Sequence, residues 1–159
     1  MVALKGSVDE QPERFLRGQV TFAAGTTGAI AQHTVFTITG MVEFTFGAQI
    51  ITDLTSGGAA TISHGRVGSV AALGAVTTAT TLDAGDFLNP ANPTWIEASV
   101  WGYGSFWGEV NAFKTSSGTD ITADILTATI TGGVIEYYLF WKPISSGATV
   151  ALGSELVAS

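Results

Sequence analysis

The sequence predicts an all-β protein: a single antiparallel β-sandwich or jelly-roll-like domain of about eight to ten short strands, preceded by an extended N-terminal arm. Two observations predict this class. Apolar and polar residues alternate with a period of two through residues 36–51, as in a strand that buries one face. Turn signals rich in glycine, aspartate and serine recur about every ten residues, and no segment has good helical periodicity.

The stretch from Phe36 to Ile51 organises the rest of the chain. Its even positions are almost all apolar, and its odd positions mostly carry hydroxyl or charged side chains. The apolar side consists of Phe36, Ile38, Val42, Phe44, Phe46, Ala48 and Ile50. Gly40 interrupts the pattern, so we expect a bulge, a bend or a break into two strands there.

Residues 1–17 differ in composition from the rest and are predicted to form the extended arm. They carry several charged side chains, and Pro12 interrupts any helix. We expect the arm to strap onto a neighbouring subunit, with a frayed terminus or a short edge strand as the alternatives. Its candidate interface residues are Arg14, Phe15, Leu16 and Arg17.

The β-domain is predicted to span residues 18–159. Its expected strands cover residues 19–23, 29–51, 59–64, 67–73, 94–100, 110–114, 120–130 and 134–141. Its expected turns and loops cover residues 25–28, 53–58, 83–86, 89–93, 116–119 and a compact hairpin turn at 131–133. The strand at 134–141 is apolar on both sides apart from Glu136, which predicts cover on both faces, inside the sandwich or at an interface. The tail from Ser145 is a weak strand or a loose end.

Composition limits the classes of function. Of the 159 residues, 46% are hydrophobic and only 12% are charged, about half the usual charged fraction. Two explanations fit so few charges. The surface of the protein is either neutral and rich in hydroxyl groups or, as we favour, partly buried in an assembly. The net charge of −7 argues against a nucleic-acid partner, and no apolar run is long enough to span a membrane. We find no classical export signal, and without cysteine the chain has no disulfide or thiolate chemistry.

Catalytic residue patterns are weak. His33 and His64 are expected to be surface or capping histidines, since no nucleophile-elbow motif accompanies them. The carboxylate pairs Asp83/Asp86 and Asp120/Asp124 flank turns, where aspartate usually bonds to local backbone. We therefore expect no enzyme activity, no cofactor and no metal site.

An aromatic cluster punctuated by glycines is the most suggestive local feature. Its members are Trp95, Trp101, Tyr103, Phe106 and Trp107. These rings suit a core plug beneath a loop, an intersubunit contact, or a carbohydrate or receptor site. Four of them, Trp101, Tyr103, Phe106 and Trp107, are candidate interface residues.

Four segments resemble a family of small tailed-phage virion proteins. They are residues 31–40 (AQHTVFTITG), 52–62 (TDLTSGGAATI), 77–86 (TTATTLDAGD) and 130–143, which begins ITGG and ends YLFWKP. The resemblance spans about residues 18–145 and consists of turn and strand motifs. The aromatic loop at 101–107 departs from that family's pattern.

The resemblance implies a virion structural protein, first of all a capsid decoration (cement) protein. Such a protein would be made in the host cytoplasm and would bind the major capsid protein as a homotrimer on the capsid surface, with no nucleic-acid or membrane partner. The alternative within phages is a tail- or fibre-associated domain that binds a receptor or carbohydrate. Outside phages, the alternative is a carbohydrate-binding β-sandwich that uses Trp101, Tyr103 and Trp107, and an enzyme comes last.

Overall fold

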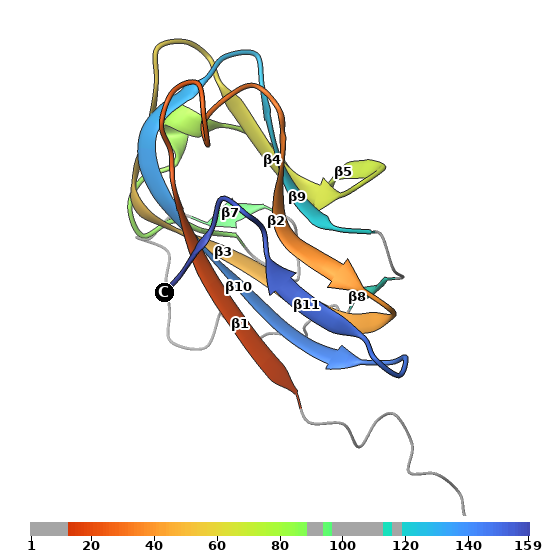
Figure 1. Cartoon of the computed structure of the whole chain (residues 1–159). Coiled ribbons are helices and arrows are strands. Elements are labelled where there is room, and N and C mark those ends of the chain that lie inside the picture. The colour runs from red at the N-terminus through yellow and green to blue at the C-terminus, as the bar shows by residue number, and fades with distance from the viewer. Residues whose placement is uncertain (1–12, 89–93, 97–112, 116–118) are drawn as a thin grey trace, which may run out of the picture.

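Twelve strands in two antiparallel sheets make up the described part of the chain in the computed structural model (Figure 1). The structure describes residues 13–88, 94–96, 113–115 and 119–159. The strands are β1 (Arg14–Thr21), β2 (Gln32–Thr39), β3 (Val42–Ser56), β4 (Thr61–Arg66), β5 (Ser69–Thr78), β6 (Phe87–Leu88), β7 (Trp95–Ile96), β8 (Phe113–Thr115), β9 (Ile121–Leu126), β10 (Ile130–Pro143), β11 (Thr149–Leu152) and β12 (Val157–Ala158). A 3-10 turn, Ala79–Thr81, follows β5. The predicted all-β sandwich is confirmed, with more strands than expected because four of them are only two or three residues long.

The two sheets pack face to face around one hydrophobic core. The seven-stranded sheet has the order β12-β1-β10-β3-β6-β7, with β8 also paired to β3, and the five-stranded sheet has the order β11-β2-β9-β4-β5. The chain therefore passes repeatedly from one sheet to the other. Within the described ranges, no helix has the length and hydropathy needed to cross a bilayer.

The alternation through residues 36–51 places its apolar side in the core, as predicted. Phe36, Phe44 and Phe46 are at most 2% exposed, and burial of each ring contributes about 2–3 kcal/mol. Gly40 has φ +74° and breaks the stretch into β2 and β3, which belong to different sheets. A side chain at Gly40 would meet Ala148 Cα at 2.9 Å, so glycine meets both the conformational and the steric requirement of this crossing.

The hairpin turn predicted at residues 131–133 is wrong. These residues lie inside β10, opposite the end of β3, and the register shifts three times between Ile130 and Ile135. Gly133 has φ +109°, which suits a β-bulge as well as a hairpin turn, so its sequence signal was ambiguous. The chain instead turns at Thr127, which takes φ +67° and hydrogen-bonds to Ala59, so the strand predicted over 120–130 ends at Leu126.

Two further boundaries differ from the expectation. The turn predicted at 53–58 is confined to its two glycines, because β3 continues to Ser56 alongside β10. Residues 14–17, placed in the arm from sequence, belong to β1, because their backbone pairs with β10 and Leu16 packs against the core. The rest of the predicted arm, residues 1–12, lies outside the described residues. The tail forms β11 and β12, each paired to one strand near the edge of a sheet.

Candidate interaction surface

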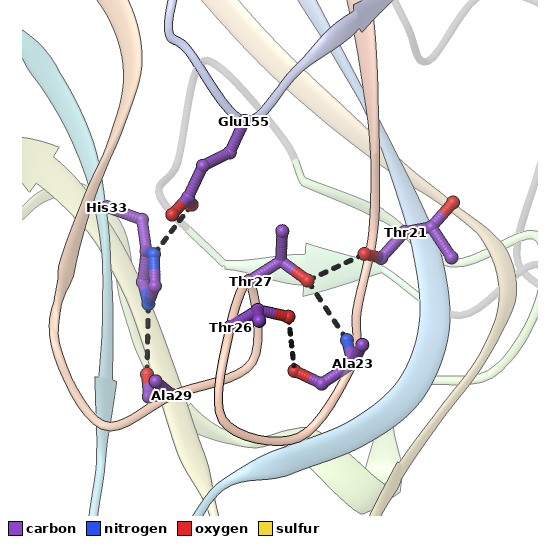
Figure 2. A network of polar contacts seen from close by, with 7 residues as sticks. All are labelled: Thr21, Ala23, Thr26, Thr27, Ala29, His33 and Glu155. Carbon is purple, nitrogen blue, oxygen red and sulfur yellow. Dashed lines mark hydrogen bonds and ion pairs between the residues drawn. The ribbon is translucent and has the colours of Figure 1, made fainter.

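His33 caps a loop. Its Nε2 lies 2.9 Å from the carbonyl oxygen of Ala29, and its Nδ1 lies 2.7 Å from the Glu155 carboxylate (Figure 2). Beside it, the Thr27 hydroxyl donates to the Thr21 carbonyl and accepts from the Ala23 amide (Figure 2). The expected capping role of His33 is confirmed, and the ring ties the loop before β2 to the segment after β11.

His64, in contrast, is not a surface histidine. It is fully buried between the sheets, where Phe46, Trp95 and Tyr137 surround its ring with centroids 5.5–5.9 Å away. Its Nε2 lies 3.1 Å from the Tyr137 hydroxyl, which links β4 to β10 across the core. Desolvation lowers the pKa of His64 to about 3, and burial raises the pKa of Tyr137. The sequence prediction failed because His64 follows a short apolar strand segment, and the position of the strand's end could not be fixed from its pattern.

The two carboxylate pairs differ in the groups that they bond to. Asp86 accepts from the Asp83 amide at 3.0 Å, and Asp120 accepts from the Ile38 amide at 3.0 Å. Asp124 accepts from Gln32 and from Thr122. As expected, Asp86 bonds to local backbone. The expectation is wrong for the other pair, because Asp120 and Asp124 bond to residues of β2 that are 82 and 92 positions away, and Asp124 lies inside β9.

Strands β1, β10 and β3 lie side by side in the seven-stranded sheet (Figure 1), and their outward side carries aromatic and polar residues. In β1, Val20 points into the core, so the alternate residues Phe15, Arg17 and Gln19 face outward. Their partners on β10 are Phe140, Tyr138 and Glu136. Gln49 of β3 lies opposite Glu136 on the other side of β10.

Three aromatic rings pack together on this face. The Phe15 ring lies 4.7 Å from that of Phe140 and 6.4 Å from that of Tyr138, measured between centroids. Phe15 is 52% exposed, which is a large apolar area for a residue held in a regular strand. Such rings, fixed by cross-strand pairing, lose little conformational entropy when a partner covers them.

A buried carboxylate fixes the polar half of the same face. Glu136 is 7% exposed; its Oε1 accepts from Gln19 Nε2 at 3.0 Å, and its Oε2 accepts from the Tyr138 hydroxyl. Burial raises the pKa of Glu136, but hydrogen bonds from Tyr138, Ser159 and Gln19 and the charge of Arg17 outweigh it, so the pKa lies below its ordinary value. The pKa of Tyr138 is raised by burial and by its bond to this carboxylate. The Glu136 carboxylate is therefore ionised at neutral pH, and its hydrogen bond from Gln19 ties β10 to β1.

Replacing Tyr138 with phenylalanine should lower the free energy of unfolding by about 2 kcal/mol, because a buried carboxylate loses a charged hydrogen bond. Chemical denaturation at neutral pH measures this loss. The same replacement in a Glu136→Gln background should cost about 1 kcal/mol less, since the remaining partner is neutral. Equal losses of stability in the two backgrounds would show that the charge of the Glu136 carboxylate does not cause the effect of replacing Tyr138.

The structure separates the candidate interface residues of β1 into two groups. Phe15 and Arg17 lie on the outward face. Leu16 packs against the core, and the Arg14 guanidinium sits 4.8 Å from the centroid of the Trp141 ring, a cation–π contact. Trp101, Tyr103, Phe106 and Trp107 lie outside the described residues. Sequence reasoning missed the polar network, although Glu136, alone among apolar neighbours, was the signal for it.

The comparisons with known proteins show a fold and no family. No protein-family model matches the chain, and no curated protein matches it. Its structure is similar to a chain of the "Acidic stable capsid structure of Helicobacter pylori bacteriophage KHP30", with a TM-score of 0.50 and 8% sequence identity. The match covers 87% of this chain and 92% of that one. The two chains thus share a fold over nearly their whole lengths.

Proposed function

We propose that this chain is a structural protein of a tailed-phage virion, and specifically a capsid decoration protein that binds the major capsid protein on the capsid surface. The observation that carries the proposal is the outward face of the seven-stranded sheet, where the hydrogen-bonded Glu136 lies beside three packed aromatic rings that include the exposed ring of Phe15. Central aromatic residues beside satisfied polar groups are typical of protein interfaces.

The architecture supports this proposal. Two sheets whose strands alternate along the chain are typical of double-sheet jelly rolls, which occur in viral capsid proteins and in lectins. The similar chain comes from a phage capsid structure, and the virion resemblance of the sequence points to the same class. The low charged fraction also suits a protein with permanent interfaces.

The proposed role is mechanical and non-catalytic. The chain would be made in the host cytoplasm and, as a homotrimer, would bind the assembled shell more tightly than its precursor. Binding of this kind stabilises the assembled state by mass action, to a degree that grows with the concentration of the free protein. Residues 1–12, ahead of β1, would extend the contact to a neighbouring subunit. Mass photometry of the purified chain tests the trimer.

Replacing Phe15 with glutamate should weaken binding to the shells of its phage at least about tenfold, because it places a charge beside the rings of Tyr138 and Phe140. Co-sedimentation with shells that lack the protein measures the affinity. Ile30→Glu is the matched control, since Ile30 is 54% exposed but lies in the loop before β2. Equal binding by both variants would contradict the role of this face. A chain that lacks residues 1–12 tests the contribution of the arm in the same assay.

A receptor- or carbohydrate-binding role is the second candidate, favoured by the same observation. The aromatic rings can stack on a sugar, and the neighbouring amides of Gln19 and Gln49 can form hydrogen bonds with its hydroxyl groups. In that case, the intact chain would bind to a glycan array and the Phe15→Ala variant would not. Neither protein would bind to shells.

A further inference from the structure

The His33 ring joins two parts of the chain that are far apart in sequence, the loop before β2 and the segment after β11 (Figure 2). Its Nε2 lies 2.9 Å from the Ala29 carbonyl oxygen, and its Nδ1 lies 2.7 Å from the Glu155 carboxylate. A carbonyl oxygen and an ionised carboxylate only accept hydrogen bonds. Both ring nitrogens must therefore donate, and only the doubly protonated imidazolium carries a hydrogen on each of them.

A neutral His33 ring cannot make both contacts. It carries one N–H, so its other nitrogen would present a lone pair to an oxygen acceptor. The Ala29 carbonyl is held in place, since the Ala29 amide donates to the Thr26 carbonyl at 3.0 Å and the Thr27 hydroxyl binds the start of the same loop. The Glu155 side chain is 36% exposed, so its carboxylate can turn into water. The contact with Glu155 is therefore the one that opens.

Glu155 is the one charged side chain within ion-pair distance of His33 in the described part of the chain. Residues 21–31, which run from the end of β1 to β2, contain no titratable side chain. On β9, the residue paired with His33 is the buried Ala123. Its neighbour Asp124 points to the other face of the sheet, where it bonds to side chains of β2 and β9. Glu155 is thus the negative charge that an added proton on His33 meets.

The segment after β11, residues 153–159, has few other contacts that attach it to the sandwich. The Gly153 amide donates to the Val35 carbonyl at 2.8 Å, and Leu156 packs against the core. The two residues of β12 pair with two residues of β1, and both are exposed. Loss of the Glu155 contact therefore removes a large share of what holds this segment.

We propose that His33 is a proton-dependent link, which holds residues 153–159 on the sandwich when its ring is protonated and releases them as the pH rises through the range in which histidine loses its charge. Release would loosen β12 from β1 beside Gln19, whose side chain binds Glu136 on the proposed interaction surface. The link goes beyond the proposed function and does not depend on it, because all of its groups belong to one free chain.

A pH titration of the folded, nitrogen-15-labelled chain by NMR tests the link. Between pH 5.5 and 8.5, His33 should change from a hydrogen on both ring nitrogens to a hydrogen on Nε2 alone. The hydrogen-exchange protection factors of the Gly153 and Leu156 amides, which correct for the intrinsic effect of pH on exchange, should fall at least about fivefold. Buried His64, with a pKa of about 3, stays neutral throughout. Unchanged protection, or a neutral ring that keeps its hydrogen on Nδ1, would overturn the proposal.

Glu155→Gln is the matched variant, because a side-chain amide can accept a hydrogen bond from the imidazolium and donate one to the neutral ring. Its protection factors should therefore change less than about twofold between the two pH values. Glu13→Gln removes the same charge just before β1, at the end of that strand away from the loop, and should respond to pH as the natural chain does. A response of Glu155→Gln as large as that of the natural chain would refute the link. Both measurements use free protein, so their outcome is separate from that of co-sedimentation with shells.

Discussion

Lowering the pH from 7 to 5 is expected to reduce the free energy of unfolding by about 2 kcal/mol, because the folded protein buries His64 in its neutral form. The pKa of His64 is about 3 in the folded state, against the ordinary histidine value of 6.5 that applies to the unfolded chain. At a pH between these two values, His64 is therefore protonated in the unfolded chain and neutral in the folded protein. Stability is fully present above pH 6.5 and falls as the pH drops through the window between the two pKa values.

The described surroundings of His64 offer no compensation for a positive charge. The groups packed on its ring are Phe46, Trp95 and Tyr137, and Gly74 of β5 lies beside it. The hydrogen-bond partner of its Nε2 is the Tyr137 hydroxyl, whose own pKa is raised by burial. A proton on the imidazole would thus remain desolvated among neutral neighbours.

The control is His64→Gln, whose amide can reach the same hydroxyl but does not titrate. Urea denaturation at intervals between pH 7 and pH 5 should give a slope for the natural chain and a nearly flat line for the variant. The series stops above the pI of about 4.5, where low net charge promotes association. The same slope in both proteins would assign the acid sensitivity to other groups.

The fold class was predictable because period-two patterning depends on backbone geometry that all strands share. Residues 36–51 encode both their buried side and the break at Gly40, since a glycine there meets a local requirement. Which strands pair was not predictable, because pairing is decided by contacts between residues far apart in the chain. Gly133 shows the limit: a positive φ serves a turn or a bulge equally well, and the course of β10 past β3 decides which one forms.

The candidate surface was only partly predictable for the same reason. Sequence identified Phe15 and Arg17 as candidate interface residues, but assigned them to an arm. Their contacts with Phe140 and Glu136 join residues more than 100 positions apart, which no local pattern encodes. His64 was misplaced because burial of a polar ring depends on the partner that the opposite sheet supplies, here Tyr137.

Replacing Gly153 with alanine is expected to lower the free energy of unfolding by about 3 kcal/mol or more, the largest effect of a single added methyl group that we predict. Gly153 follows β11, where its amide donates to the Val35 carbonyl at 2.8 Å. A Cβ at this position would lie 1.8 Å from the Thr34 carbonyl oxygen and 2.7 Å from the Thr34 carbonyl carbon. Both atoms belong to the backbone of β2, so relief requires moving a strand that also pairs with β9.

The control for this clash is Gly57→Ala, because a Cβ there has nothing within 4 Å and Gly57 has no positive φ. Its effect should stay within about 0.5 kcal/mol of zero or be slightly stabilising, since alanine reduces the entropy of the unfolded chain. Thermal and urea denaturation of the two variants measure the contrast. If Gly153→Ala is as stable as Gly57→Ala, the tail does not pass against β2 as the structure places it. The route by which β11 and β12 return to the edges of the two sheets would then have to be redrawn.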